Sequence, residues 1–290
     1  MPANPVLVRI PTTDGLLLDG ALSEAPADKP KSRAWVFLHG TGSNFTTPGI
    51  LEGLAQLVSS RGEAVLRLNT RGHDLLAKIP TMSGSVRGGA AFDHIGEAHL
   101  DIEAAVAWLI DAGYGQVSLL GHSLGGVKVI VSQSEHPMAE VDEIVALSPP
   151  RLRYESLIQD HAFKQHFDQA RQLVDSGRGQ EFVEMVSPAK LWMPAQGIVD
   201  KYGLEDRFDI VEHLARVKAA TLVFIDSKSL LSSAAHQGLE DALTDLARSH
   251  SALSVQHHPD DIRYSGSEVV IANQIAAWRA KRDTMMDAGI

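Results

Sequence analysis

The stretch Val117–Gly126 constrains the fold of this chain more than any other part of the sequence. An apolar run leads there into the pentapeptide GHSLG, which is centred on Ser123. The apolar run predicts a buried strand, and the residues after the pentapeptide predict a helix. The two glycines of the pentapeptide lack a Cβ, so strand and helix can pass close to each other at a sharp turn. The pattern therefore predicts a strained turn that exposes the Ser123 hydroxyl, with a helix N-terminus pointing at it.

Composition excludes several classes of function. The formal net charge is −10 and the pI is about 5.7, so we expect no nucleic-acid partner. The chain has no cysteine, which excludes disulfides, thiolate metal sites and a cysteine nucleophile. Neither a signal-peptide pattern nor a membrane-spanning apolar run is present in the sequence, so we expect no membrane partner and a cytoplasmic location. Because we find no ligand cluster or phosphate-binding loop, we expect neither a metal nor an organic cofactor.

Apolar strand patterns alternate with helical patterns along most of the chain. The turn Asp14–Gly15 favours a hairpin between the first two strands. Such alternation predicts an α/β fold, in which helices cover both faces of a mostly parallel central sheet. The expected strands are 6–10, 16–22, 34–38, 64–68, 117–120, 143–147, 221–226 and 253–257, and the main expected helices are 50–60, 93–111 and 268–282.

Residues 151–207 interrupt this alternation. They carry helical patterns over 155–174, 179–185 and 191–202, and they concentrate aromatic and methionine side chains that include Trp192. We expect them to form a helical cap, while residues 1–150 and 208–290 form the core domain. In one interpretation these aromatic side chains pack on one another as the core of the cap. In the other they contact a small apolar or aromatic ester-like substrate, and we expect Trp192 to make such a contact.

The order of these elements, the turn His39-Gly40-Thr41-Gly42 and the pentapeptide around Ser123 resemble the α/β-hydrolase fold superfamily. The likeness runs from about residue 7 to about residue 283, and it is to esterase-like serine hydrolases with a helical cap. It implies that Ser123 is the nucleophile and that the backbone N–H groups of Thr41 and Leu124 form the oxyanion hole. We expect His39 and His122 to lie beside the substrate.

The other two members of the implied catalytic triad depart from the family pattern. The family places an acid after the seventh strand and a histidine before the last helix. Ser229 and Ile262 occupy those positions here, whereas Asp226 and His258 lie a few residues earlier. In one interpretation Asp226 and His258 form a shifted pair with His258 as the base. In the other interpretation the triad is lost.

The resemblance implies hydrolysis of a carboxylic ester or lactone through an acyl-enzyme on Ser123. One alternative is a cofactor-free lyase or a C–C bond hydrolase on the same scaffold. Another is a non-catalytic, ligand-binding homologue with a degenerate triad. The sequence leaves the substrate and the oligomeric state open, with a homodimer as one alternative.

Overall fold

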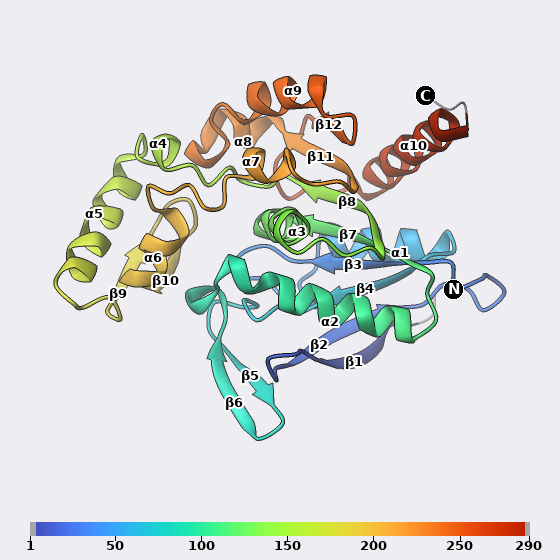
Figure 1. The fold of residues 1–290 in the computed structure, drawn as a ribbon, viewed down its shortest axis with the longest axis horizontal. Helices are drawn as coiled ribbons and strands as arrows, with labels where there is room; N and C mark the ends of the chain where they lie inside the picture. The colour runs from blue at the N-terminus through green and yellow to red at the C-terminus, as the bar shows by residue number, and fades with distance from the viewer. Residues whose placement is uncertain (1–3, 288–290) are drawn as a thin grey trace.

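The structure, a computed structural model, describes residues 4–287 and is built around a central eight-stranded sheet (Figure 1). Its strand order is β1-β2-β4-β3-β7-β8-β11-β12. The β1–β2 and β2–β4 pairs are antiparallel, and the remaining neighbours are parallel, which confirms the mostly parallel sheet. The strands are β1 (Val6–Pro11), β2 (Leu17–Ser23), β3 (Arg33–Leu38), β4 (Ala64–Leu68), β7 (Gln116–His122), β8 (Val141–Leu147), β11 (Ala220–Asp226) and β12 (Leu253–His258).

Helices cover both faces of this sheet. One face carries α2 (Ala98–Asp111), α3 (Leu124–Glu135), α7 (Ile210–Leu214) and α9 (Leu239–Ser249), and the other carries α1 (Ile50–Ser60) and α10 (Glu268–Asp287). Side chains of β3 alternate between the two apolar clusters. Val36 and Leu38 pack under α2 and α3, whereas Trp35 and Phe37 pack under α1 and α10. Burial on both faces explains why the parallel strands read as continuous apolar runs. No helix within residues 4–287 is long and apolar enough to cross a membrane.

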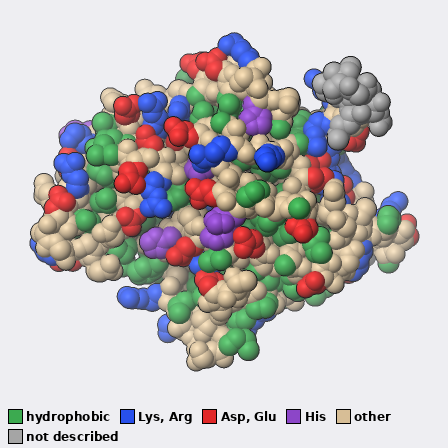
Figure 2. Space-filling model, in the orientation of Figure 1, with side chains coloured by type: hydrophobic (Ala, Val, Ile, Leu, Met, Phe, Trp, Pro, Cys, Tyr) green, Lys and Arg blue, Asp and Glu red, His purple; other side chains and the backbone are tan. Residues whose placement is uncertain are grey.

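A hairpin outside the sheet, β5 (Ala77–Thr81) and β6 (Gly84–Gly88), is a feature that the sequence did not predict. Pro80 lies inside β5, and a proline normally argues against a strand because it cannot donate to the ladder. Figure 2 shows hydrophobic side chains exposed where this hairpin projects, and Met82 is 84% exposed. After the hairpin, two short 3₁₀ turns, η1 (Ala90–Phe92) and η2 (Ile95–Glu97), precede α2. The helix predicted from Asp93 therefore begins at Ala98.

The insertion between β8 and α7 lies at one end of the sheet (Figure 1). It contains α4 (Tyr154–Leu157), α5 (His161–Asp175), β9 (Phe182–Met185), β10 (Leu191–Pro194) and α6 (Ala195–Tyr202). The helices predicted over 179–185 and 191–202 are wrong for residues 182–185 and 191–194, which pair as an antiparallel hairpin. Burial there follows a period of two: Leu191 and Met193 are buried, and Trp192 between them is exposed. The division into core and cap domains stays a proposal.

Candidate active site

Ser123 occupies the sharp turn between β7 and α3. Its φ of 53° and ψ of −121° lie in a region that L-residues rarely adopt. The surrounding packing holds this conformation. The Ser123 N–H donates to the Leu147 carbonyl at 2.8 Å, and a Cβ on Gly121 would lie only 2.1 Å from the Gly125 carbonyl oxygen. The close approach of β7 and α3 therefore requires glycine and fixes the Ser123 backbone.

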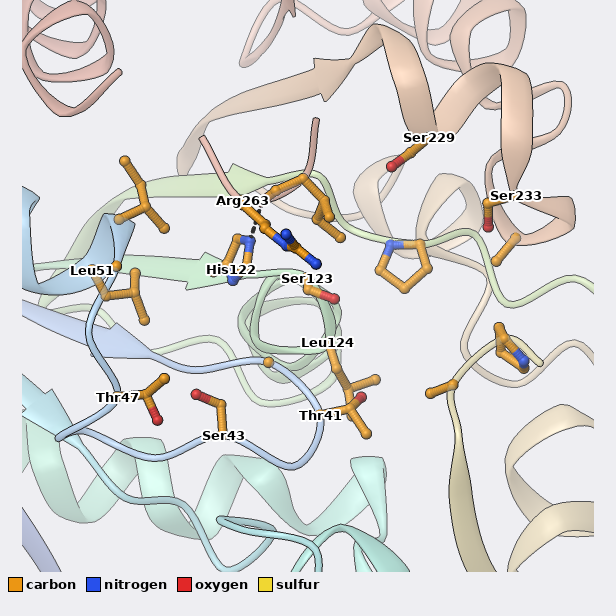
Figure 3. Close-up of a pocket in the computed structure, with 18 of the residues that line it drawn as sticks. Thr41, Ser43, Thr47, Leu51, His122, Ser123, Leu124, Ser229, Ser233 and Arg263 are labelled. Carbon is orange, nitrogen blue, oxygen red and sulfur yellow. Dashed lines mark hydrogen bonds between the residues drawn. The ribbon is translucent and has the colours of Figure 1, made fainter. Parts of the chain in front are cut away.

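A cavity of about 580 Å³ lies in front of Ser123, a volume typical of small-molecule sites. Figure 3 shows the Ser123 hydroxyl directed into it and away from the His122 ring. Within residues 4–287, the Ser123 Oγ makes no hydrogen bond. The insertion contributes Leu152, Pro188, Ala189 and Tyr202 to the wall. The core domain contributes Gly40, Thr41, Ser43, Asn44, Thr47, Pro48, Gly49, Ile50, Leu51, His122, Leu124, Pro150, Ser229, Ser233, Ala235, His236, Ile262, Arg263 and Ser265.

Two backbone N–H groups beside Ser123 are available to a ligand. Thr41 and Leu124 both line the cavity, and Figure 3 shows them on the same side of Ser123. Neither N–H donates a hydrogen bond to any residue that the structure describes. A Cβ on Gly40 would lie 3.1 Å from the Ser123 Cβ, so the loop that carries Thr41 closely approaches the serine. The two N–H groups are placed to donate hydrogen bonds to the oxyanion of a tetrahedral intermediate whose carbon is bonded to the Ser123 Oγ.

His39 lies behind this loop and outside the cavity. Its Nδ1 is 2.9 Å from the Gly40 carbonyl oxygen, and its Nε2 accepts from the Thr70 N–H at 3.3 Å. Burial, helped by the charge of Lys128, lowers the pKa of His39 to about 4, so the ring is neutral. The structure thus places His39 off the cavity wall, with its ring 3% exposed and supporting the loop from the protein side, and the expected substrate contact stays a prediction.

His122 does line the cavity, as expected. Its Nε2 donates to the Ile262 carbonyl at 2.6 Å, which ties β7 to the segment after β12 (Figure 3). Burial lowers the pKa of His122, although the Ile262 carbonyl and the charge of Asp226 oppose that effect. Burial thus favours the neutral ring, which holds the carbonyl of Ile262, the residue before Arg263.

Asp226 and His258 are adjacent in register on β11 and β12, but each makes its hydrogen bonds elsewhere. The Oδ1 of Asp226 accepts from the Ser229 N–H at 2.8 Å and caps α8 (Ser227–Ser232). The Nε2 of His258 is 3.1 Å from the Ser267 Oγ. Neither residue lines the cavity. The Tyr264 ring packs near both histidines, with its centroid 4.9 Å from that of the His258 ring and 6.3 Å from that of the His122 ring.

His236 is a cavity residue that sequence reasoning missed. It is the last residue of the short 3₁₀ turn η3 (Ala234–His236). The Arg151 N–H donates a hydrogen bond to the Ala235 carbonyl at 2.6 Å and so fixes this turn. Its ring is buried, and in the described part of the chain neither of its nitrogens nor the Oδ2 of Asp226 has a hydrogen-bond partner. Burial lowers the pKa of His236, while the charge of Asp226 and the Ser148 carbonyl oppose this. His236 follows β11, where the family pattern places an acid rather than a histidine, so the pattern does not point to it.

Trp192 lies outside the cavity. It is 55% exposed on the outer side of β10 and is not a cavity residue, so the structure does not support the expected contact with a substrate, which stays a prediction. The aromatic side chains of the insertion pack mainly on one another: the Phe163 centroid is 5.7 Å from that of Phe167 and 5.8 Å from that of Tyr202. Of these rings, only Tyr202 reaches the cavity wall.

A group of possible metal ligands, His99, Glu103 and His136, lies away from this cavity, where α2 meets the end of α3. Their nearest ligand atoms are within 4.8 Å of one another. The two imidazoles stack with centroids 3.7 Å apart and planes 9° apart. Nearly parallel rings cannot both direct an in-plane lone pair at one ion, so this arrangement does not fit a bound metal.

Comparisons with known proteins agree with this geometry. Residues 35–281 match the model of the family described as "Alpha/beta hydrolase family". None of the curated proteins matches the chain significantly. Among solved structures, Est1E from Butyrivibrio proteoclasticus with bound ferulic acid has a TM-score of 0.66 at 13% identity, covering 96% of this chain and 99% of that chain.

Two further structures share the fold. An esterase from Pyrococcus furiosus has a TM-score of 0.63 at 16% identity, covering 96% of this chain and 90% of that one. A soluble variant of monoglyceride lipase from Saccharomyces cerevisiae, in complex with a substrate analogue, has a TM-score of 0.63 at 12% identity, with 95% of each chain covered.

Proposed function

The chain belongs to the alpha/beta hydrolase family, and we propose on this premise that it hydrolyses small carboxylic esters or lactones through an acyl-enzyme on Ser123. One observation carries the proposal. The Ser123 Oγ faces a cavity from a strained turn, beside two backbone N–H groups that have no acceptor among the described residues. A nucleophile and a preorganised oxyanion site are the two parts that acyl transfer needs at the carbonyl.

In the proposed reaction, the Ser123 Oγ attacks the substrate carbonyl carbon and loses its proton to a base. The carbonyl oxygen becomes an oxyanion that accepts from the N–H groups of Thr41 and Leu124. Collapse of this intermediate breaks the bond to the leaving alkoxide, which takes the proton from the base. A water molecule then repeats the sequence on the acyl-enzyme, releasing the acid and restoring the serine.

We assign the base to His236, with Asp226 orienting it, in place of His258. The ring of His236 lines the cavity that the Ser123 hydroxyl faces, whereas His258 is hydrogen-bonded to Ser267 outside it. Both ring nitrogens of His236 are enclosed in the resting structure. Because neither is hydrogen-bonded to a described residue, turning the ring toward Ser123 breaks no hydrogen bond. Catalytic hydrogen bonds often form only once substrate is bound.

The neighbouring structures guide the choice of test substrates. Ferulic acid, bound to Est1E, is an aromatic carboxylic acid, which supports including aromatic esters in the assay. Tyr202 is an aromatic side chain on the cavity wall against which such a group could pack.

A ligand-binding homologue without turnover is the second candidate. It is favoured by one observation: in the part of the chain that the structure describes, no imidazole is hydrogen-bonded to the Ser123 Oγ. Such a protein would bind ester-like molecules saturably but would not hydrolyse them.

Turnover of 4-nitrophenyl acetate, butyrate and an aromatic ester distinguishes the two candidates. We expect wild-type hydrolysis that falls to the buffer rate in Ser123→Ala. Ser265→Ala is the matched control, since Ser265 lines the same cavity away from the turn, and it should retain turnover. A Ser123→Ala variant as active as the wild type would overturn the proposed function. Saturable binding without wild-type turnover would support the second candidate.

A further inference from the structure

Arg263 is the one side chain with a permanent charge on the wall of the Ser123 cavity. None of the lining residues is an aspartate or a glutamate. Burial also keeps the two lining imidazoles, His122 and His236, neutral near pH 7. The chain as a whole carries a formal charge of −10, so a cavity with a lone cation differs in sign from the rest of the molecule.

The guanidinium of Arg263 has no carboxylate partner within residues 4–287. Its backbone, by contrast, is held on both sides. The Arg263 N–H donates to the Asp261 Oδ1 at 2.9 Å, and the preceding carbonyl, of Ile262, accepts from His122 at 2.6 Å. The following residue, Tyr264, is anchored by a 2.5 Å hydrogen bond between its hydroxyl and the Ser148 Oγ. The backbone of Arg263 is thus fixed, while the charge of its guanidinium is not neutralised by a described carboxylate.

Arg263 and Ser123 line the same cavity, and both are drawn in Figure 3. Hydroxyl groups surround the same space. In the described structure, the side-chain hydroxyls of Thr41, Ser43, Ser229 and Ser233 donate no hydrogen bond. A guanidinium fork with hydroxyl donors around it is chemically complementary to a carboxylate, which accepts several hydrogen bonds at once.

We propose that the substrate carries a free carboxylate a few atoms from its scissile ester and that Arg263 binds this carboxylate. The proposal rests on the proposed function, because it places the ester carbonyl at Ser123. The substrate class is then the half-ester of a short dicarboxylic acid or a similar anionic ester. Arg263 and Ser123 line the same cavity, so the carboxylate and the ester of one small substrate can occupy it together.

The test compares monoethyl glutarate with its uncharged isostere, in which a carboxamide replaces the carboxylate. We expect kcat/KM for the acid to exceed that for the amide by about tenfold to hundredfold, the size of one charge-assisted pair. Arg263→Gln should bring the ratio close to one, and Arg263→Lys should keep part of it, because lysine retains the charge but not the fork. Raising the ionic strength should reduce the wild-type ratio.

Lys228→Gln is the matched control. Lys228 is a nearby cation whose Nζ lies 3.8 Å from the Asp261 Oδ2, and it does not line the cavity. Its loss should leave the acid-to-amide ratio intact. A wild-type ratio near one, or a ratio that survives in Arg263→Gln, would overturn the proposal.

Calorimetric titration with glutarate separates this proposal from the proposed function. We expect glutarate to bind the wild type and to bind Arg263→Gln at least about tenfold more weakly. Binding of that kind without hydrolysis of any ester would support anion recognition and contradict the hydrolase function. Hydrolysis of neutral esters without any glutarate binding would support the hydrolase function and contradict anion recognition.

Discussion

Lys128 and Asp93 form an ion pair inside the protein. The Nζ of Lys128 lies 2.8 Å from the Oδ2 of Asp93, and the two side chains are 2% and 1% exposed. The pair joins α3 to the residue that directly follows η1. Lys201 of α6 is also buried, and its charge acts on the Asp93 carboxylate. The pair therefore lies where the core packs against the insertion.

Replacing Lys128 should strongly destabilise the fold. Lys128→Met leaves a buried carboxylate without its main partner, which costs about 3–5 kcal/mol in the free energy of unfolding. Urea denaturation at pH 7 measures this. Arg178→Met is the control, because it removes an exposed ion pair with Glu181 that solvent screens and that contributes little to stability. Equal effects of the two substitutions would contradict the buried pairing.

Lowering the pH should reduce the loss of unfolding free energy that Lys128→Met causes. Burial alone would raise the pKa of Asp93, but the charges of Lys128 and Lys201 bring it below its ordinary value. A depressed carboxyl pKa contributes stability above the unfolded pKa, about 3.9, and this stability is lost as pH falls through the folded pKa. In Lys128→Met, burial raises the pKa of Asp93 because its main opposing charge is gone. Urea titrations from pH 7 down to pH 3 should therefore show the difference in unfolding free energy between wild type and Lys128→Met narrowing as the pH falls, beginning above the ordinary carboxyl pKa of about 3.9. A difference in unfolding free energy that stays the same from pH 7 to pH 3 would contradict the coupling between Asp93 and Lys128.

Gly121→Ala should prevent folding of the turn at Ser123. The added Cβ would lie 2.1 Å from the Gly125 carbonyl oxygen, a backbone atom that cannot move aside without separating β7 from α3. We expect loss of soluble, cooperatively unfolding protein, measured by expression yield and circular dichroism. Gly96→Ala is the control, since a Cβ there meets nothing within 4 Å. Normal folding of Gly121→Ala would contradict the close approach.

The pH dependence of kcat/KM should identify the base. Burial lowers the pKa of His236, so the acid limb of the profile should have its midpoint below the unperturbed value of about 6.5. The charge of Asp226 acts to raise that pKa, so Asp226→Asn should shift the midpoint to still lower pH and also reduce kcat. His236→Gln should cost a factor of about 10²–10⁴ in kcat.

His258→Gln is the comparison for that experiment. We expect it to retain most of the activity, because His258 is hydrogen-bonded to Ser267 outside the cavity. The opposite result, an inactive His258→Gln with an active His236→Gln, would restore the pair inferred from the sequence and exclude His236 as the base.

The sequence was informative where one local pattern determines the structure. Continuous apolar runs such as 34–38 indicated parallel strands buried on both faces, and the glycines around Ser123 indicated the sharp turn. Strands β9 and β10 were predicted as helices, because a short apolar run does not distinguish a strand from a helix. The outward position of Trp192 then followed from the strand alternation.

The walls of the site depend on contacts between distant parts of the chain. Asp226 and His258 are neighbours in register, as their similar displacement from the family positions suggested, yet neither lines the cavity and Tyr264 packs near the His258 ring. Nothing in the local sequence indicates that Tyr264 folds back to reach Ser148, or that the turn ending at His236 joins the cavity wall. Such relations are set by tertiary packing and become visible only in the structure.

Covalent labelling of Ser123 tests the central claim most directly. The wild-type protein is treated with a fluorophosphonate, and the adduct is located by mass spectrometry of the intact chain and of its peptides. The account predicts one adduct per chain on the peptide that contains Ser123, no adduct in Ser123→Ala, and normal labelling of Ser265→Ala. An unlabelled wild-type protein, or an adduct that persists in Ser123→Ala, would contradict the assignment of Ser123 as the nucleophile.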